Sequence, residues 1–170
     1  EFRRVLFRSF NVGNAESNGV EFDFTSMITD NWTLSGAASF LESELVEDYR
    51  RSASSPEPDA PAGSRLPRVP EVKWNVSTRY TFANDWFAQA AYMYTGDSYN
   101  DLFGGFRQLQ GSYDVVNASF GLERSNWTAE LYVQNLTDER GDVWINDVNW
   151  DERVTINQPR TIGFRWQQRF

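Results

Sequence analysis

Apolar and polar residues alternate in short stretches along most of the chain. In residues 160–170 one parity is apolar and aromatic, and the other is polar and cationic. Because successive side chains of a strand point to opposite faces of a sheet, this pattern predicts a strand with one apolar and one polar face. The same pattern predicts seven strands, over residues 19–28, 32–40, 74–82, 86–94, 113–122, 127–134 and 160–170. Such strands build soluble β-sandwiches, and they also build barrels that stand between lipid and a watery lumen.

The connections between these strands alternate between short and long. The short turns are residues 29–31, 83–85 and 123–126. The long loops, rich in proline, glycine or polar residues, are residues 41–70, 95–111 and 138–158. Alternate connections of an antiparallel meander lie at the same end, so we expect every short turn at one rim and every long loop at the other, as in outer-membrane barrels. Bacterial outer-membrane barrels usually have an even number of strands, and an open sheet edge is not tolerated in lipid. We therefore expect these seven strands to be part of a larger barrel.

Three tryptophans stand directly after the short turns. Trp32, Trp86 and Trp127 each begin the apolar face of the following strand. In a barrel these indoles would lie at one height and form an aromatic girdle at a membrane interface, because indole combines an apolar body with one N–H donor. In a soluble sandwich each would cap a hydrophobic core. We favour the girdle.

The composition removes several classes of function. The 170 residues contain no Cys and no His, so they form no disulfide or thiolate metal site and lack the usual general base. The net charge of -8, with Lys73 as the only lysine, argues against nucleic acid as a partner. Acidic residues lie mostly in loops, where solvation is the ordinary explanation. We therefore expect no enzyme activity, no catalytic residue, no metal site and no cofactor.

One ion pair can be predicted from the alignment of the last two strands. Aligning them at the rim of the short turns places Glu130 opposite Gln167, between Arg165 and Arg169 on the polar face. We expect Glu130 to pair with one of these arginines. The alternative is solvated surface charge, which contributes about 0–1 kcal/mol even when paired.

Residues 1–9 show little of the alternation between apolar and polar residues that marks the later strands. Residues 1–9 are expected to be a cloning or assembly remnant or the stump of a preceding strand, and residues 10–170 one barrel segment. In one alternative, residues 2–12 supply the eighth strand of a small outer-membrane barrel with a structural or adhesive role. In another, the chain is a soluble all-β carbohydrate-binding domain.

Three short motifs resemble one family. Residues 11–21 (NVGNAESNGVE) are similar to the NxGxAxxxGxE stretch in the barrels of TonB-dependent outer-membrane receptors. Residues 131–138 (LYVQNLTD) resemble their VxNLxD stretch, and residues 159–170, which begin Pro159-Arg160-Thr161 and end at Phe170, resemble their final strand. The motifs occur in the family's order and together span nearly the whole chain.

The resemblance implies an all-β fold, in which an antiparallel up-and-down meander of about seven strands is the C-terminal segment of a 22-stranded transmembrane β-barrel. It also implies a bacterial cell outer membrane location and TonB-energised uptake of a scarce ligand, most often a ferric siderophore or another iron complex. The implied partners are outer-membrane lipid, the receptor's own plug domain, the TonB complex through an N-terminal part, the barrel-assembly machinery and a small-molecule ligand. The terminal aromatic strand resembles the signal read by the assembly machinery, which would involve Phe164, Trp166 and Phe170.

Ligand contacts in such a receptor should come from the long loops. Aromatic, amide and cationic side chains of the second and third long loops are the candidates, namely Tyr99, Phe103, Phe106, Arg107, Trp144, Asn146 and Trp150. They have the mixed aromatic and polar character of binding loops, and Arg107 would suit an anionic siderophore. The alternative, that these loop side chains pack on one another, is equally open.

Overall fold

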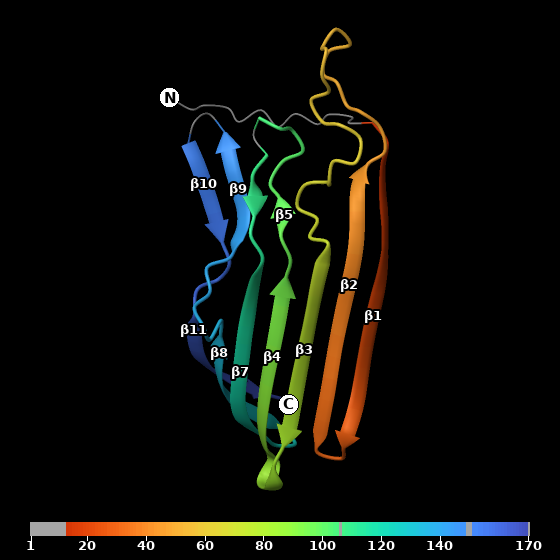
Figure 1. Ribbon diagram of the computed structural model, residues 1–170. Coiled ribbons are helices and arrows are strands. Elements are labelled where there is room, and N and C mark those ends of the chain that lie inside the picture. Colours follow the sequence, from red (N-terminus) through yellow and green to blue (C-terminus); the bar gives the residue numbers. More distant parts are fainter. Residues whose placement is uncertain (1–12, 106, 149–150, 170) are drawn as a thin grey trace.

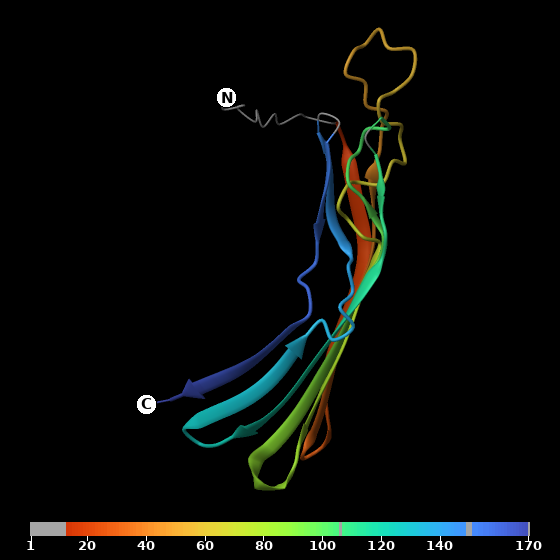
Figure 2. The ribbon, with the colours of Figure 1, turned by 90° about the vertical axis from the view of Figure 1, so that its left-hand side faces the viewer.

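The computed structural model describes residues 13–105, 107–148 and 151–169. Its main feature is one antiparallel sheet of seven strands in the order β1-β2-β3-β4-β7-β8-β11. These strands are β1 (Ala15–Thr29), β2 (Trp32–Leu45), β3 (Val72–Thr81), β4 (Trp86–Thr95), β7 (Tyr113–Glu123), β8 (Trp127–Gln134) and β11 (Thr161–Gln168). Figure 2 shows the sheet as a single curved layer. The predicted all-β meander is therefore confirmed.

The short and long connections separate to opposite ends of the sheet, as predicted (Figure 1). We call these the short-turn end and the long-loop end. The turn between β3 and β4 is the 3-10 segment η1 (Ala83–Asp85), in which Asn84 and Asp85 have φ of 61° and 65°. Asn and Asp tolerate this left-handed conformation better than most residues, so these residues suit a tight turn.

The long loops carry more regular structure than the sequence indicates. The second contains a small hairpin, β5 (Ser98–Tyr99) with β6 (Leu109–Gln110), and the third contains β9 (Asp142–Val148) with β10 (Asp151–Ile156). β1 and β2 also extend beyond their apolar stretches, with Ala15 opposite Leu45. These parts lack strict apolar alternation, and their strand conformation is maintained by backbone pairing. Among the described residues, no helix is long and apolar enough to cross a membrane.

One face of the sheet is apolar and open. Register partners share this face across every strand pair, for example Val20 with Phe40 and Phe164 with Leu131. We call it the apolar face; its large exposed side chains include Val20, Phe22, Phe40, Trp74, Phe120, Leu131, Ile162, Phe164 and Trp166. The exposed fraction reaches 67% at Val20 and 75% at Ile162. A continuous apolar surface of this kind marks contact with another protein or with a membrane, and the described residues leave it uncovered.

The opposite, polar face is organised by two arginine–carboxylate pairs. Arg79 pairs with Glu123 at 2.7 Å and lies 3.8 Å over the ring of Phe87, which is only 2% exposed. Phe87 fits on this face because Gly121, its register partner, leaves room for the ring.

The second pair is the predicted one, with a corrected register. Arg165 NH1 lies 2.9 Å from Glu130 Oε2, which confirms the ion pair. However, Arg165 itself stands opposite Glu130, and Gln167 stands opposite Thr128, so the predicted alignment was wrong by two residues. β8 and β11 are connected at the long-loop end, where Thr161 pairs with Gln134. The register is fixed there, and aligning the strands at the short-turn end was therefore misleading.

Candidate ligand-binding site

The long loops are tied together at their end of the sheet. The first and second long loops are joined by a hydrogen bond of 2.7 Å that Arg68 N donates to Tyr99 O. They also share a small buried cluster, in which Leu102 packs with Leu45 and Ala60. The second and third are linked by Asn100, which is 6% exposed and donates its side-chain amide to Ile145 O at 3.2 Å. These contacts make the loops one connected unit.

Tyr99 lies at the centre of an arginine cluster. The Arg107 guanidinium lies 3.7 Å from the centroid of the Tyr99 ring, and the Arg65 guanidinium lies 5.4 Å from it. Arg65 is also held by two carboxylates, since its Nε is 2.8 Å from Glu71 and its NH1 is 3.0 Å from Asp97. These are cation–π contacts within the loops, and the role of Tyr99 in ligand binding stays a prediction.

Trp144 forms a second arginine–aromatic pair. The Arg68 guanidinium lies 5.0 Å from the centroid of the Trp144 ring, which is 39% exposed. The Arg68 backbone has φ of 62°, which is uncommon for a residue other than glycine. Through the Arg68–Tyr99 hydrogen bond, this pair adjoins the Tyr99 cluster.

The other predicted loop residues are distributed differently. Phe103 packs against Tyr49 with ring centroids 5.6 Å apart, and Arg51 covers its ring at 4.1 Å. Phe103, like Tyr99 and Trp144, thus contacts other loop side chains, and its role in ligand binding stays a prediction. Asn146 lies in β9 opposite Arg153. Phe106 and Trp150 lie outside the described residues.

Sequence reasoning missed Arg65 and Arg68. They lie in the long, proline-rich first loop, where charged residues are usually solvated. Their partners Tyr99 and Trp144 are distant in sequence, so only the three-dimensional arrangement of the loops shows the pairing. The sequence signal that was available is the short Arg65-Leu66-Pro67-Arg68 spacing.

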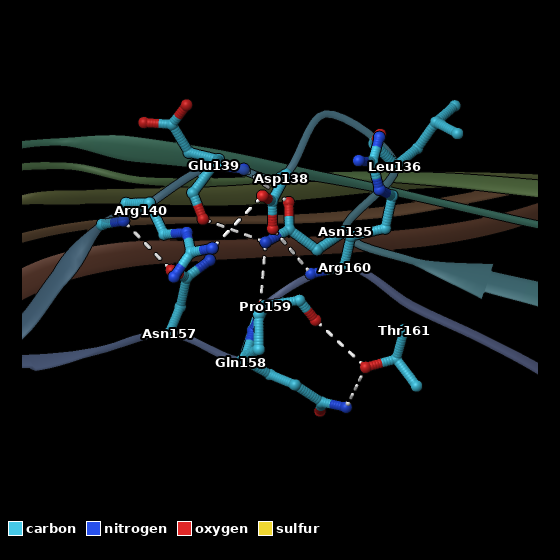
Figure 3. A network of polar contacts seen from close by, with 11 residues as sticks. Asn135, Leu136, Asp138, Glu139, Arg140, Asn157, Gln158, Pro159, Arg160 and Thr161 are labelled. Atoms are coloured by element: carbon cyan, nitrogen blue, oxygen red, sulfur yellow. Dashed lines mark hydrogen bonds and ion pairs between the residues drawn. The ribbon is translucent and has the colours of Figure 1, made fainter.

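A second polar site holds the third long loop to the sheet (Figure 3). Asn135 is 2% exposed; its amide donates to Glu139 O and Gln158 O at 2.9 Å each, and its Oδ1 accepts from Glu139 N at 2.9 Å. Asp138 accepts a hydrogen bond from Arg160 N at 2.9 Å and pairs with Arg140 at 3.2 Å. The backbone N–H of Arg160 and the Arg140 side chain hold the pKa of Asp138 below its ordinary value. We call Asn135, Asp138, Glu139, Gln158 and Arg160 the Asn135 network.

The three tryptophans predicted to form a girdle lie on the apolar face beside the short turns. Trp32 and Trp86 are 39% and 42% exposed, whereas Trp127 is half-buried. Trp32 Nε1 donates to Thr78 Oγ1 at 2.7 Å. Trp86 stacks on Phe120, and Trp127 stacks on Trp166 with ring centroids 4.7 Å apart. They therefore do not fill a protein core.

The residues predicted to form an assembly signal lie at the last strand. Phe164 and Trp166 project from the apolar face of β11 and are 62% and 53% exposed. Phe170 lies outside the described residues. Within the described part of the chain, no group of three or more acidic residues is arranged to hold a metal ion.

Comparison with known proteins assigns the family. Residues 2–136 match the family described as TonB dependent receptor-like, beta-barrel. The chain belongs to this family of TonB-dependent receptor barrels, which lie in the bacterial outer membrane and act in transport rather than as enzymes.

Two curated relatives agree with this family. The chain is 26% identical over 133 residues to the probable TonB-dependent siderophore receptor PiuA of Acinetobacter baumannii, covering 76% of this chain and 18% of that protein. It is 28% identical over 146 residues to the metal-pseudopaline receptor CntO of Pseudomonas aeruginosa, covering 79% of this chain and 19% of that protein. The chain thus spans less than a fifth of the length of either relative.

Solved structures share the fold. The crystal structure of PiuA from A. baumannii matches with a TM-score of 0.73 at 22% identity, covering 89% of this chain and 21% of that one. The crystal structure of the ferric yersiniabactin uptake receptor FyuA of Yersinia pestis matches with a TM-score of 0.71 at 20% identity, covering 89% of this chain and 23% of that one. Family membership sets aside both the small adhesive barrel and the soluble carbohydrate-binding domain.

Proposed function

We propose that residues 10–170 are the C-terminal part of the barrel of an outer-membrane receptor. This receptor imports a scarce ligand, namely a ferric siderophore or another iron complex, with energy from TonB. The observation that carries this proposal is the sheet itself. Its apolar face is open, its polar face carries ion pairs, and its long loops meet at one end. A barrel in lipid that presents binding loops to the outside has these three properties.

The sheet edges support a larger assembly. Within the described sheet, β1 and β11 each pair with only one neighbour. An unpaired strand edge is too costly in lipid, so further strands of the receptor would close the barrel. The curated relatives are long enough to supply them, because the matched regions are 18% and 19% of their lengths.

The ligand class is inferred from the relatives and the loops. One relative is called a probable siderophore receptor and the other a metal-pseudopaline receptor. Tyr99, Arg107 and Trp144 offer aromatic faces and cationic donors at the long-loop end, which suits a polar metal complex.

The remaining parts of the proposal follow from this assignment. Trp32, Trp86 and Trp127 would form the girdle at the periplasmic interface of the lipid. Phe164, Trp166 and Phe170 would be recognised by the barrel-assembly machinery, and the polar face would enclose the plug domain through which TonB acts. Residues 1–9 would be a remnant or a partial strand.

An uptake assay tests the proposal. The full-length receptor is produced in a bacterium that lacks its own siderophore receptors, and growth under iron limitation is measured with ferric siderophores supplied one at a time. We expect growth with at least one complex in cells with TonB, and none in the matched strain without TonB. Growth that is independent of TonB, or no growth and no binding with any metal complex, would contradict the proposed function.

A further inference from the structure

The arginines of the long loops differ in how their charge is neutralised. Arg65 is bound by both Glu71 and Asp97. Among the residues that the structure describes, no carboxylate forms an ion pair with Arg68 or Arg107. Within the described part of the chain, two cationic groups therefore remain without an anionic partner, although the net charge of the sequence is -8.

Each of these two guanidinium groups lies over an aromatic ring, which leaves its positive charge unneutralised. The Arg107 guanidinium lies 3.7 Å from the Tyr99 centroid, and that of Arg68 lies 5.0 Å from the Trp144 centroid. A guanidinium placed over a ring can still donate hydrogen bonds from N–H groups at its edge. The Nε of Arg107 is buried and has no hydrogen-bond partner among the described residues. A buried donor of this kind is costly unless a further group accepts from it.

The two pairs are preorganised next to each other. Arg68 N donates to Tyr99 O at 2.7 Å, so the backbone that carries one arginine is bound to the residue under the other. Arg68 is held at φ of 62°, a conformation that costs energy and is often found where a ligand binds. Three long loops contribute to this arrangement, since Arg68, Arg107 and Trp144 each come from a different one.

We propose that Arg68 and Arg107, stacked on Trp144 and Tyr99, bind a metal chelate that carries several negative charges, by donating hydrogen bonds from their guanidinium edges. This inference rests on the proposed uptake function and specifies the charge class of the ligand. An anionic chelate supplies acceptors for charge-assisted hydrogen bonds from the guanidinium N–H groups. A neutral chelate leaves both positive charges without a counter-charge.

The test measures binding of two probes to the purified full-length receptor, namely a triply negative ferric tris-catecholate and a neutral ferric trihydroxamate. We expect the wild-type receptor to bind the tris-catecholate more tightly. Arg107→Gln and Arg68→Gln should each weaken that binding by about tenfold or more, as expected for loss of a hydrogen bond to a charged group. Added salt should weaken tris-catecholate binding to the wild-type receptor, because screening acts on the same charges.

The matched control is Arg124→Gln, which removes an arginine from the short-turn end and should leave the affinity unchanged. Tighter wild-type binding of the neutral probe, or unchanged tris-catecholate affinity in both loop variants, would overturn this inference while leaving the uptake function intact. If the Arg107→Gln receptor does not fold, the affinity of the Arg68→Gln receptor and the salt dependence of the wild type still test the inference, because Arg68 is exposed. A receptor that binds neither probe and supports no TonB-dependent growth contradicts the proposed function, and this inference with it.

Discussion

Replacing Asn135 with alanine should release the third long loop from the sheet. Asn135 is 2% exposed, and three hydrogen bonds of 2.9 Å join its side chain to Glu139 and Gln158. Each such bond contributes about 1 kcal/mol net. The backbone of Asn135 also has a φ of 51°. This left-handed conformation costs alanine about 1 kcal/mol relative to the right-handed region. The loss should therefore be about 4 kcal/mol of local stability.

Amide hydrogen exchange of the full-length receptor measures this loss. A change of about 4 kcal/mol corresponds to roughly a thousandfold faster exchange when opening is at equilibrium. The effect should appear at Glu139 N, which donates to Asn135, and at Gly141 N, which donates to Asn157 at 3.0 Å. β1 and β2 are separated from β8 in the sheet by β3, β4 and β7, and they should exchange as in the wild type.

Two further variants separate the causes. Asn135→Gly removes the hydrogen bonds but accepts the positive φ, so it should recover about 1 kcal/mol relative to alanine. Asn126→Ala makes the same change in the exposed short turn before β8 and should have little effect. Exchange at residues 139–141 that stays within a few-fold of wild type in Asn135→Ala would refute this reasoning.

The remaining predictions concern the polar face and the same network. Gly121→Ala should destabilise the barrel by about 1–3 kcal/mol in denaturant titrations, because the added Cβ would collide with the backbone oxygen of Ala129 and come 2.7 Å from the ring of Phe87. Gly104→Ala is its control and should be neutral, because no atom lies within 4 Å of the added Cβ. A double-mutant cycle of Glu130→Gln and Arg165→Gln should give a coupling of about 0–1 kcal/mol, since the Arg165 side chain is 57% exposed and water screens the pair from that side, although the Glu130 side chain is only 15% exposed. A coupling of several kcal/mol would contradict this. The folded state lowers the pKa of Asp138 from its ordinary 3.8, so its contribution to stability is present above that pH and is lost as pH falls through the lower folded value. Asp138→Asn should therefore flatten the acid limb of the stability profile below about pH 4, and an unchanged acid limb would contradict this.

Alternation in the sequence was sufficient to predict the sheet. Seven strands, the position of each tryptophan after a short turn and the separation of the two kinds of connection all follow from local patterns. These features depend on side-chain parity and turn chemistry, which are properties of neighbouring residues.

The features that were missed depend on contacts between distant residues. The β8–β11 register is fixed by the Asn135 network and was wrong by two positions when aligned from the opposite end. The arginine cluster joins residues from three loops, so its members could not be grouped from sequence. The hairpins β5–β6 and β9–β10 lack the apolar alternation by which the other strands were found.

The central claim is that the apolar face contacts lipid, and a single-residue scan along β8 tests it most directly. Single cysteines carrying nitroxide labels are placed in turn at residues 127–134 of the full-length receptor in lipid bilayers. The labels' collision rates with oxygen and with a water-soluble nickel chelate are then compared. We predict that oxygen accessibility alternates with a period of two and is highest at Ala129, Leu131 and Val133, whose side chains share the apolar face. Equal oxygen accessibility at both parities, or higher values at Thr128, Glu130 and Tyr132, would contradict the membrane-facing sheet.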